Sequence, residues 1–105
     1  MPAGLDGSHL LPAADRDIQD AYDRVAHRGP GSGRAFLDAL DLHLEQFRRF
    51  PLIGPVYGGP YRRLLIRRFR LGIFYAVEPD RLVVHAVLDL RQDPETIRRR
   101  LGESG

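Results

Sequence analysis

One short segment of this chain holds the residues best suited to chemistry. The stretch 61–75 reads YRRLLIRRFRLGIFY and contains five arginines, four of them in two adjacent pairs. A guanidinium binds a carboxylate or a phosphate through two parallel hydrogen bonds. The segment is therefore either a surface for an acidic protein or a phosphate backbone, or simply the solvated side of a strand.

His85 is the histidine best placed for proton transfer, because it is expected to point to an uncovered sheet face with Asp89 nearby. Cleavage of RNA without a metal needs a proton acceptor, cations for the developing phosphate charge and an acid for the leaving group. Arg63, Arg67 and Arg91 are the candidates for the second role. A polar residue within a binding surface remains the favoured interpretation of His85.

Composition excludes several classes of site. The chain has no cysteine, which removes disulfides, thiolate metal sites and cysteine nucleophiles. It has no histidine pair at metal-ligand spacing, no phosphate-binding glycine loop and no nucleophile elbow, so we expect neither a metal nor a cofactor. No stretch approaches the roughly 20 apolar residues of a membrane span, and MPAGLDGSHLLP does not resemble a secretion signal. We expect a cytoplasmic protein with no membrane partner.

The elements that position these residues are predicted from periodicity. With 105 residues and 43% hydrophobic content, the chain is large enough for one modest core, so we expect a single domain over 1–105 with 1–6 as a loose leader. A weak first strand follows the leader. Helical spacing predicts an amphipathic helix over about 12–28, and a second helix that Ser32 caps and Pro51 ends.

After residue 60 the apolar period changes to two. Strands are predicted at 61–67, 71–78 and 81–88, followed by a short basic helix that Asp93 caps and that ends at Gly102. The predicted fold class is α+β: an N-terminal helical hairpin on one face of a small, mainly antiparallel sheet, in the order β-α-α-β-β-β, with a short C-terminal helix.

A two-residue turn at Pro79-Asp80 sets the faces of this sheet by pairing Val77 with Leu82. One face is almost wholly apolar and is predicted to be the core: Leu71, Ile73, Tyr75, Val77, Leu82, Val84, Ala86 and Leu88. A second tight turn at Arg68-Phe69 adds Leu64 and Ile66 to this core face, whereas a register slip of one residue would exchange the two faces of that strand. The other face is predicted to be open, and it places Arg63, Leu65 and Arg67 beside Phe74 and His85, with Asp89 and Arg91 at its edge. Apolar residues exposed among arginines indicate an interaction surface.

The order of the elements and several segments resemble the RelE/ParE superfamily of bacterial type II toxins, over about residues 8–101. The similar segments are LPAADRDIQDAYDRV, GSGRAFLDALDLHLEQFRRFP, YRRLLIRRFRLGIFYAVEPDRLVVHAVLDLRQDP and the basic helix that follows. The resemblance implies a cognate antitoxin that neutralises the toxin in a hetero-oligomer. It also implies one of two activities: RelE-like members cut messenger RNA in the ribosomal A site, and ParE-like members inhibit DNA gyrase without cleaving RNA.

The long leading helices and the R-x-D-P exit resemble the ParE side more closely. On that basis the residues expected to contact the antitoxin or the target are Arg63, Leu65, Arg67, Phe74, His85, Asp89 and Arg91. Family members near this pattern often have a histidine after V-L and a second arginine before D-P, where this chain has Asp89 and Gln92. Three hypotheses follow: a ParE-like toxin, a RelE-like endoribonuclease with Arg63, Arg67, His85 and Arg91 as catalytic candidates, and a toxin relic that only binds.

Overall fold

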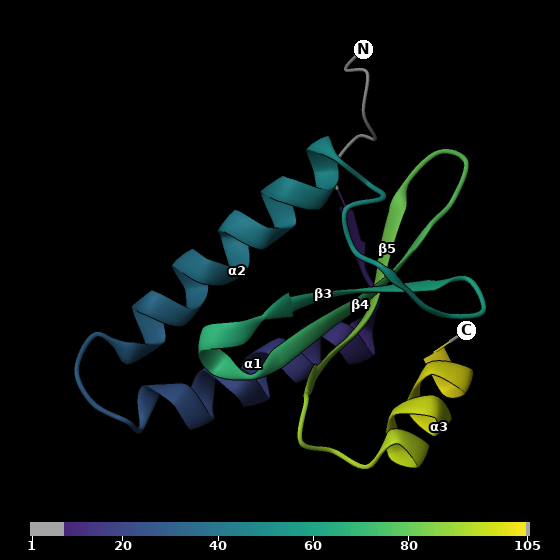
Figure 1. The fold of residues 1–105 in the computed structure, drawn as a ribbon. Helices are drawn as coiled ribbons and strands as arrows, with labels where there is room; N and C mark the ends of the chain where they lie inside the picture. The colour runs from purple at the N-terminus through teal and green to yellow at the C-terminus, as the bar shows by residue number, and fades with distance from the viewer. Residues whose placement is uncertain (1–7, 105) are drawn as a thin grey trace.

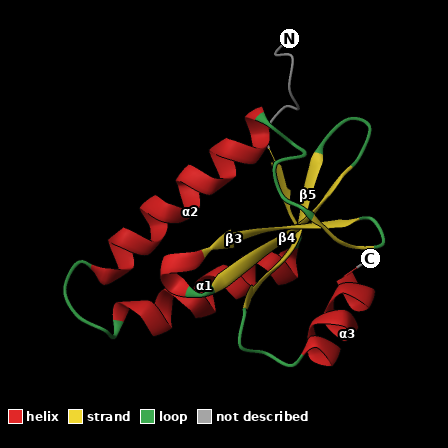
Figure 2. Cartoon of the chain, viewed as in Figure 1, coloured by secondary structure: helices red, strands yellow, loops and turns green. Residues whose placement is uncertain are grey.

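A computed structural model describes residues 8–104 as three helices and a five-stranded sheet (Figures 1 and 2). In chain order the elements are β1 (Ser8–Leu10), α1 (Pro12–Ala26), α2 (Ser32–Arg49), β2 (Val56–Gly58), β3 (Tyr61–Ile66), the 3-10 turn η1 (Arg67–Phe69), β4 (Leu71–Val77), β5 (Leu82–Asp89) and α3 (Pro94–Ser104). The predicted α+β class and the order of the helices and of four strands are confirmed. The short strand β2 was not predicted, and the predicted loose leader lies outside the described residues.

The helical hairpin forms as its sequence indicates. Pro12 occupies the first turn of α1, where its missing N–H costs no intrahelical bond. The loop to α2 contains Gly29 and Gly31 with φ of 145° and 82°, values that glycine adopts without a steric penalty. Gly31, rather than the predicted Ser32, is the N-cap of α2, and Ser32 is its first residue.

The strands are arranged in the order β1-β5-β4-β3-β2, with β1 parallel to β5 and every other pair antiparallel. The helical hairpin of α1 and α2 covers one face of this sheet (Figure 1). Phe36 and Phe47 of α2 pack there against Ile73, Tyr75 and Val84, and all five side chains are fully buried. This layer is the main core, as the alternation of apolar residues predicted, except that Val77 at the end of β4 is exposed.

The register between β3 and β4 is confirmed, with Leu64 opposite Ile73 and Ile66 opposite Leu71. Leu64 and Ile66 therefore face the helical hairpin, and Arg63 and Leu65 face the other way. Arg67 was predicted to lie in the strand, but it begins the 3-10 turn η1 instead.

The register between β4 and β5 is correct only for its first half. Val77 pairs with Leu82 and Tyr75 with Val84, but Phe74 then pairs with Ala86, so His85 is an extra residue in β5. A bulge of this kind moves the following side chains to the opposite face. Beyond it Val87 joins the main core, and Ala86 and Leu88, which were predicted to lie there, belong to the other face.

The second face of the sheet is not open as predicted, because α3 covers it (Figure 2). Ile97 and Leu101 of α3 pack on Phe74, Ala86 and Leu88 in a second, smaller core. The Tyr61 hydroxyl also donates a hydrogen bond of 3.0 Å to the Leu101 carbonyl. The sheet is therefore sandwiched between the helical hairpin and the C-terminal helix.

An ion pair joins α1 to α3 beside strand β5. The Asp17 carboxylate accepts hydrogen bonds from Nη1 and Nη2 of Arg100 at 2.9 and 2.6 Å. Asp17 Oδ2 also accepts the Val87 N–H at 3.0 Å, two residues past the bulge. One carboxylate thus connects all three layers of the fold.

Among the described residues, no helix combines the length and the apolar character needed to cross a membrane.

Candidate functional site

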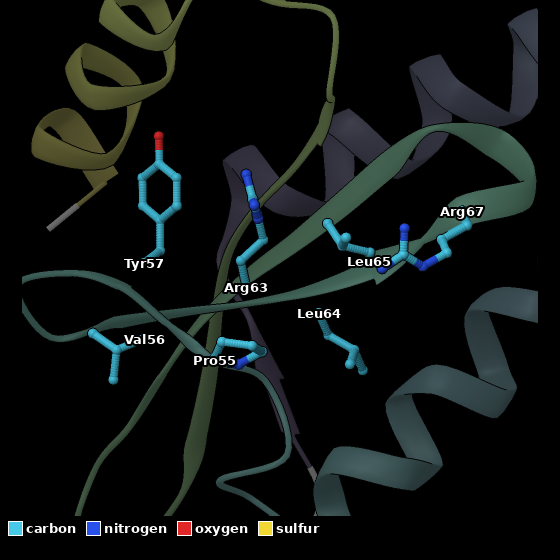
Figure 3. A pocket seen from close by; sticks show the side chains of 7 residues that line it. All are labelled: Pro55, Val56, Tyr57, Arg63, Leu64, Leu65 and Arg67. Atoms are coloured by element: carbon cyan, nitrogen blue, oxygen red, sulfur yellow. The ribbon is translucent and has the colours of Figure 1, made fainter.

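The arginine-rich side of β3 borders a cavity of about 440 Å³ (Figure 3). Its lining comes from two short stretches, Pro55–Tyr57 and Arg63–Leu65, together with Arg67. The Arg63 guanidinium carbon lies 5.2 Å from the centre of the Tyr57 ring, a cation–π distance that orients the cation beside the cavity. Three of the residues predicted to form a binding surface, Arg63, Leu65 and Arg67, are therefore brought together here.

These arginines differ in exposure. The Arg63 and Leu65 side chains are half-buried, whereas Arg67 is exposed at the start of η1. Within residues 8–104, neither Arg63 nor Arg67 forms a salt bridge. Their guanidinium groups are available to the carboxylates or phosphates of a binding partner.

The wall of the cavity depends on a hydrogen-bond network that the sequence did not reveal. The buried Tyr75 hydroxyl accepts the Gly54 N–H at 2.9 Å and donates to the Pro51 carbonyl at 2.8 Å. Burial raises the pKa of Tyr75, so its hydroxyl keeps the proton that it donates. The Arg62 guanidinium donates to the Gly54 carbonyl at 2.8 Å. Tyr75 and Arg62 together hold the segment that leads into Pro55.

Gly54 is required at its position by close packing rather than by an unusual backbone angle. A Cβ atom there would lie 2.8 Å from the Tyr75 hydroxyl and 3.1 Å from the Arg63 carbonyl oxygen. Neither neighbour can move away easily, because one is part of the buried network and the other is backbone. The glycine allows the chain to pass this close to β3.

Phe74 and His85 are not on an accessible surface. Phe74 is completely buried, with the Tyr57 ring against it edge-on at 5.1 Å. His85 is 8% exposed, and its ring packs edge-on against Tyr61 at 5.0 Å. The prediction that these two side chains face solvent is wrong, because α3 and Tyr57 cover the face they occupy. Phe74 therefore lies behind Tyr57, which lines the cavity, whereas His85 lies behind Tyr61, which does not.

Asp89 does not orient His85. The two residues are four positions apart on β5, and a strand rises about 3.3 Å per residue, so their side chains cannot meet. The Asp89 carboxylate instead binds Arg91, accepting Nε at 3.0 Å and Nη2 at 2.7 Å, and also the Arg91 backbone N–H at 2.8 Å. Arg91 is thus paired with a carboxylate at the end of β5, and neither residue lines the cavity beside Arg63.

We expect Asp89→Asn to reduce the loss of stability in acid. The hydrogen bonds from Arg91 lower the pKa of Asp89 from its usual 3.8 to about 2 in the folded protein. A carboxylate whose pKa is lowered by folding stabilises the protein fully above its unfolded pKa, and this contribution is lost as the pH falls toward the folded pKa. Between about pH 4 and pH 2 the urea midpoint of the wild type should therefore fall more steeply than that of the variant.

Asp20→Asn is the matched control, because Asp20 is an exposed aspartate on α1. Its urea midpoint should follow the wild type across the same pH range. Equal acid sensitivity in the wild type and in Asp89→Asn would show that the Asp89–Arg91 pair contributes nothing to folding.

Tyr57 is the functional neighbour that sequence reasoning missed. Tyr57 lies on β2, and its ring contacts both Arg63 and Phe74. The only signal for β2 in the sequence was VY within the segment PLIGPVYGGP, whose glycines and prolines are typical of a loop.

The comparison with protein families agrees with this architecture. Residues 9–94 match the family model described as the ParE toxin of the type II toxin–antitoxin system parDE. No curated protein gives a significant match to the chain. The matched stretch begins at the second residue of β1 and ends at the first residue of α3. It includes both helices of the hairpin, strands β2 to β5 and the cavity beside β3. The chain belongs to the ParE toxin family of type II toxin–antitoxin systems.

Proposed function

We propose that this protein is a toxin that a cognate antitoxin neutralises, and that it inhibits a cellular target, DNA gyrase, by binding to it. The observation that carries this proposal is the pair of arginines, Arg63 and Arg67, on either side of Leu65 at an open cavity. Two cations that flank an apolar residue suit an acidic protein surface, since guanidinium groups bind carboxylates while the leucine is removed from water.

Inhibition by binding accounts for the site better than cleavage of RNA does. A metal-independent nuclease needs a proton acceptor within hydrogen-bond reach of the substrate hydroxyl. The candidate acceptor, His85, is buried, and its ring packs against Tyr61. The third candidate cation, Arg91, is bound by Asp89. Only Arg63 and Arg67 of the four catalytic candidates lie beside the cavity.

A ribosome-dependent endoribonuclease is the second candidate function, and one contact favours it. The Tyr57 phenol lies next to the Arg63 guanidinium at the rim of the cavity. A phenol and a cation in this arrangement would serve as an acid and as a stabiliser of phosphate charge. The antitoxin would neutralise either activity in a hetero-oligomer in the cytoplasm.

Controlled expression with two measurements separates the hypotheses. A gyrase inhibitor is expected to arrest growth, and the purified protein should block supercoiling of relaxed plasmid by gyrase while transcripts stay intact. Cleaved transcripts with normal supercoiling would overturn the gyrase proposal in favour of the nuclease. Normal growth, despite accumulation of the folded protein, would identify a relic that only binds.

A further inference from the structure

The loop between α2 and β2 exposes a cluster of large apolar side chains. Phe50, Leu52, Ile53 and Val56 are between 43% and 64% exposed. The other large apolar residues with comparable exposure, among those that the structure describes, are scattered over α1, α2 and β4. We call residues 50–56, which contain these four side chains, the apolar loop. An exposed apolar patch of this kind usually marks a surface that a partner covers.

Hydrogen bonds to its backbone fix the conformation of the apolar loop. The hydroxyl of Tyr75, which is buried in the main core, binds both the Pro51 carbonyl and the Gly54 N–H. The Arg62 guanidinium donates to the carbonyls of Leu52 and Gly54 at 3.4 and 2.8 Å. The four exposed side chains take no part in this network. A loop that is already ordered loses less conformational entropy when a partner binds it, so its apolar groups are presented for binding.

The segment that contains the apolar loop carries only positive charge. Residues 46–77 contain seven arginines and no acidic residue. At one end of the loop the Arg49 guanidinium carbon lies 5.9 Å from the centre of the Phe50 ring, and Arg49 is exposed. At the other end Val56 lines the cavity that Arg63 and Arg67 border (Figure 3). The apolar loop therefore lies between three cations, none of which forms a salt bridge within residues 8–104.

These features define the chemistry of the partner. A second copy of this chain would bring its own arginines close to Arg49 and Arg63, and like charges oppose such an association. An anionic bilayer attracts cations, but it neither requires a fixed loop nor fills a cavity of defined shape. A protein face that has apolar side chains at its centre and carboxylates at its border matches the loop, the cations and the cavity together.

We propose that the apolar loop and the cavity beside β3 form one continuous surface, and that an acidic, partly apolar face of the target protein binds there. Phe50, Leu52 and Ile53 are removed from water against apolar groups of the target. Carboxylates of the target bind Arg49 at one end and Arg63 at the other, beyond the cavity. The inference rests on the proposed function in one respect, because gyrase is the target expected to supply this face.

The double variant Phe50→Ser with Leu52→Ser tests the apolar contacts. Both side chains are exposed, so its thermal melt should match that of the wild type. We expect the protein concentration that halves gyrase supercoiling to rise about 100-fold, because two apolar anchors are lost. Leu42→Ser is the matched control, since Leu42 is 58% exposed on α2 and lies outside the apolar loop. It should inhibit gyrase as the wild type does.

Tyr75→Phe tests whether the fixed conformation of the loop matters. It removes the hydroxyl that binds Pro51 and Gly54 but leaves every exposed side chain of the loop in place. Exchange of the Gly54 N–H should accelerate, and about tenfold more protein should be needed to halve supercoiling. Ile97→Val, a small deletion in the core beneath α3, controls for the general loss of stability and should not change inhibition. Equal inhibition by Tyr75→Phe and the wild type would contradict the role of the fixed loop.

The outcomes separate this inference from the proposed function. Inhibition that Phe50→Ser with Leu52→Ser retains in full would overturn the inference and leave gyrase as the target. Failure of the wild type to inhibit supercoiling would overturn both. If inhibition is retained, sedimentation with vesicles of phosphatidylglycerol and phosphatidylethanolamine, and ultracentrifugation of the chain alone, identify the other occupants. Vesicle binding or self-association that only the double variant loses would assign the apolar loop to a lipid surface or to a second copy.

Discussion

Asp17→Ala is expected to lower the free energy of unfolding by about 3 kcal/mol, because it removes one partner of a largely buried ion pair. The Asp17 carboxylate is 11% exposed, and it accepts two hydrogen bonds from Arg100 and one from the Val87 N–H. The value is at the lower end of the range for buried pairs, since the Arg100 side chain is 24% exposed. Urea denaturation monitored by circular dichroism measures the change.

Loss of this ion pair should also loosen α3. That helix contains Arg98, Arg99 and Arg100 in succession, so trypsin cleaves it readily once it leaves the sheet. We expect faster cleavage of Asp17→Ala at these arginines, under conditions where the rest of the chain stays folded.

Two controls make the result specific. Asp20→Ala, on the exposed side of the same helix, should change stability by less than about 0.5 kcal/mol. Asp17→Leu combined with Arg100→Met should recover much of the lost stability, because apolar residues replace both charges. If Asp17→Ala and Asp20→Ala behave alike, the ion pair does not hold α3 in place.

The double variant Arg63→Ala with Arg67→Ala is expected to abolish growth arrest and target inhibition without unfolding the domain. Each guanidinium offers charge-assisted hydrogen bonds worth roughly 1.5–3 kcal/mol when a partner desolvates them. Loss of both should weaken target binding by about 100-fold or more. The free energy of unfolding should fall only by the contribution of the Arg63–Tyr57 cation–π contact, about 0.5–1 kcal/mol. Supercoiling assays and a thermal melt measure the two effects separately.

Arg68→Ala with Arg99→Ala is the matched control, because it removes the same net charge from two exposed positions that do not line the cavity. It should retain full activity. Equal loss of activity in both double variants would show that overall charge, and not the β3 surface, determines target binding.

Much of the fold could be predicted from local patterns. Helical spacing located α1 and α2 to within about two residues, and period-two alternation located β3, β4 and β5. The faces of β3 and β4 were also predicted correctly, because the short turns at each end leave little freedom of register. This is why Arg63 and Leu65 were placed correctly on the face away from the helical hairpin.

Two parts of the sheet could not be predicted from such patterns. β2 consists of three residues in a glycine- and proline-rich segment, and it is a strand because β3 pairs with it, not because of its own propensity. The bulge at His85 leaves no signal in an apolar run, since VVHAVL reads as one continuous strand. For that reason Ala86 and Leu88 were assigned to the wrong face.

By itself, the sequence determined the three helices, four of the five strands, their order, the family resemblance and the two arginines that border the cavity. All of these depend on the identity and spacing of residues that are close together in the chain. Only the tertiary structure decided that Phe74 and His85 are covered. The arginine-rich helix α3 covers that face with two buried apolar residues, Ile97 and Leu101. An ion pair between Asp17 and Arg100, which are 83 positions apart in the sequence, holds this helix in place. A contact over such a separation forms only when the layers close, so no local pattern encodes which face it buries.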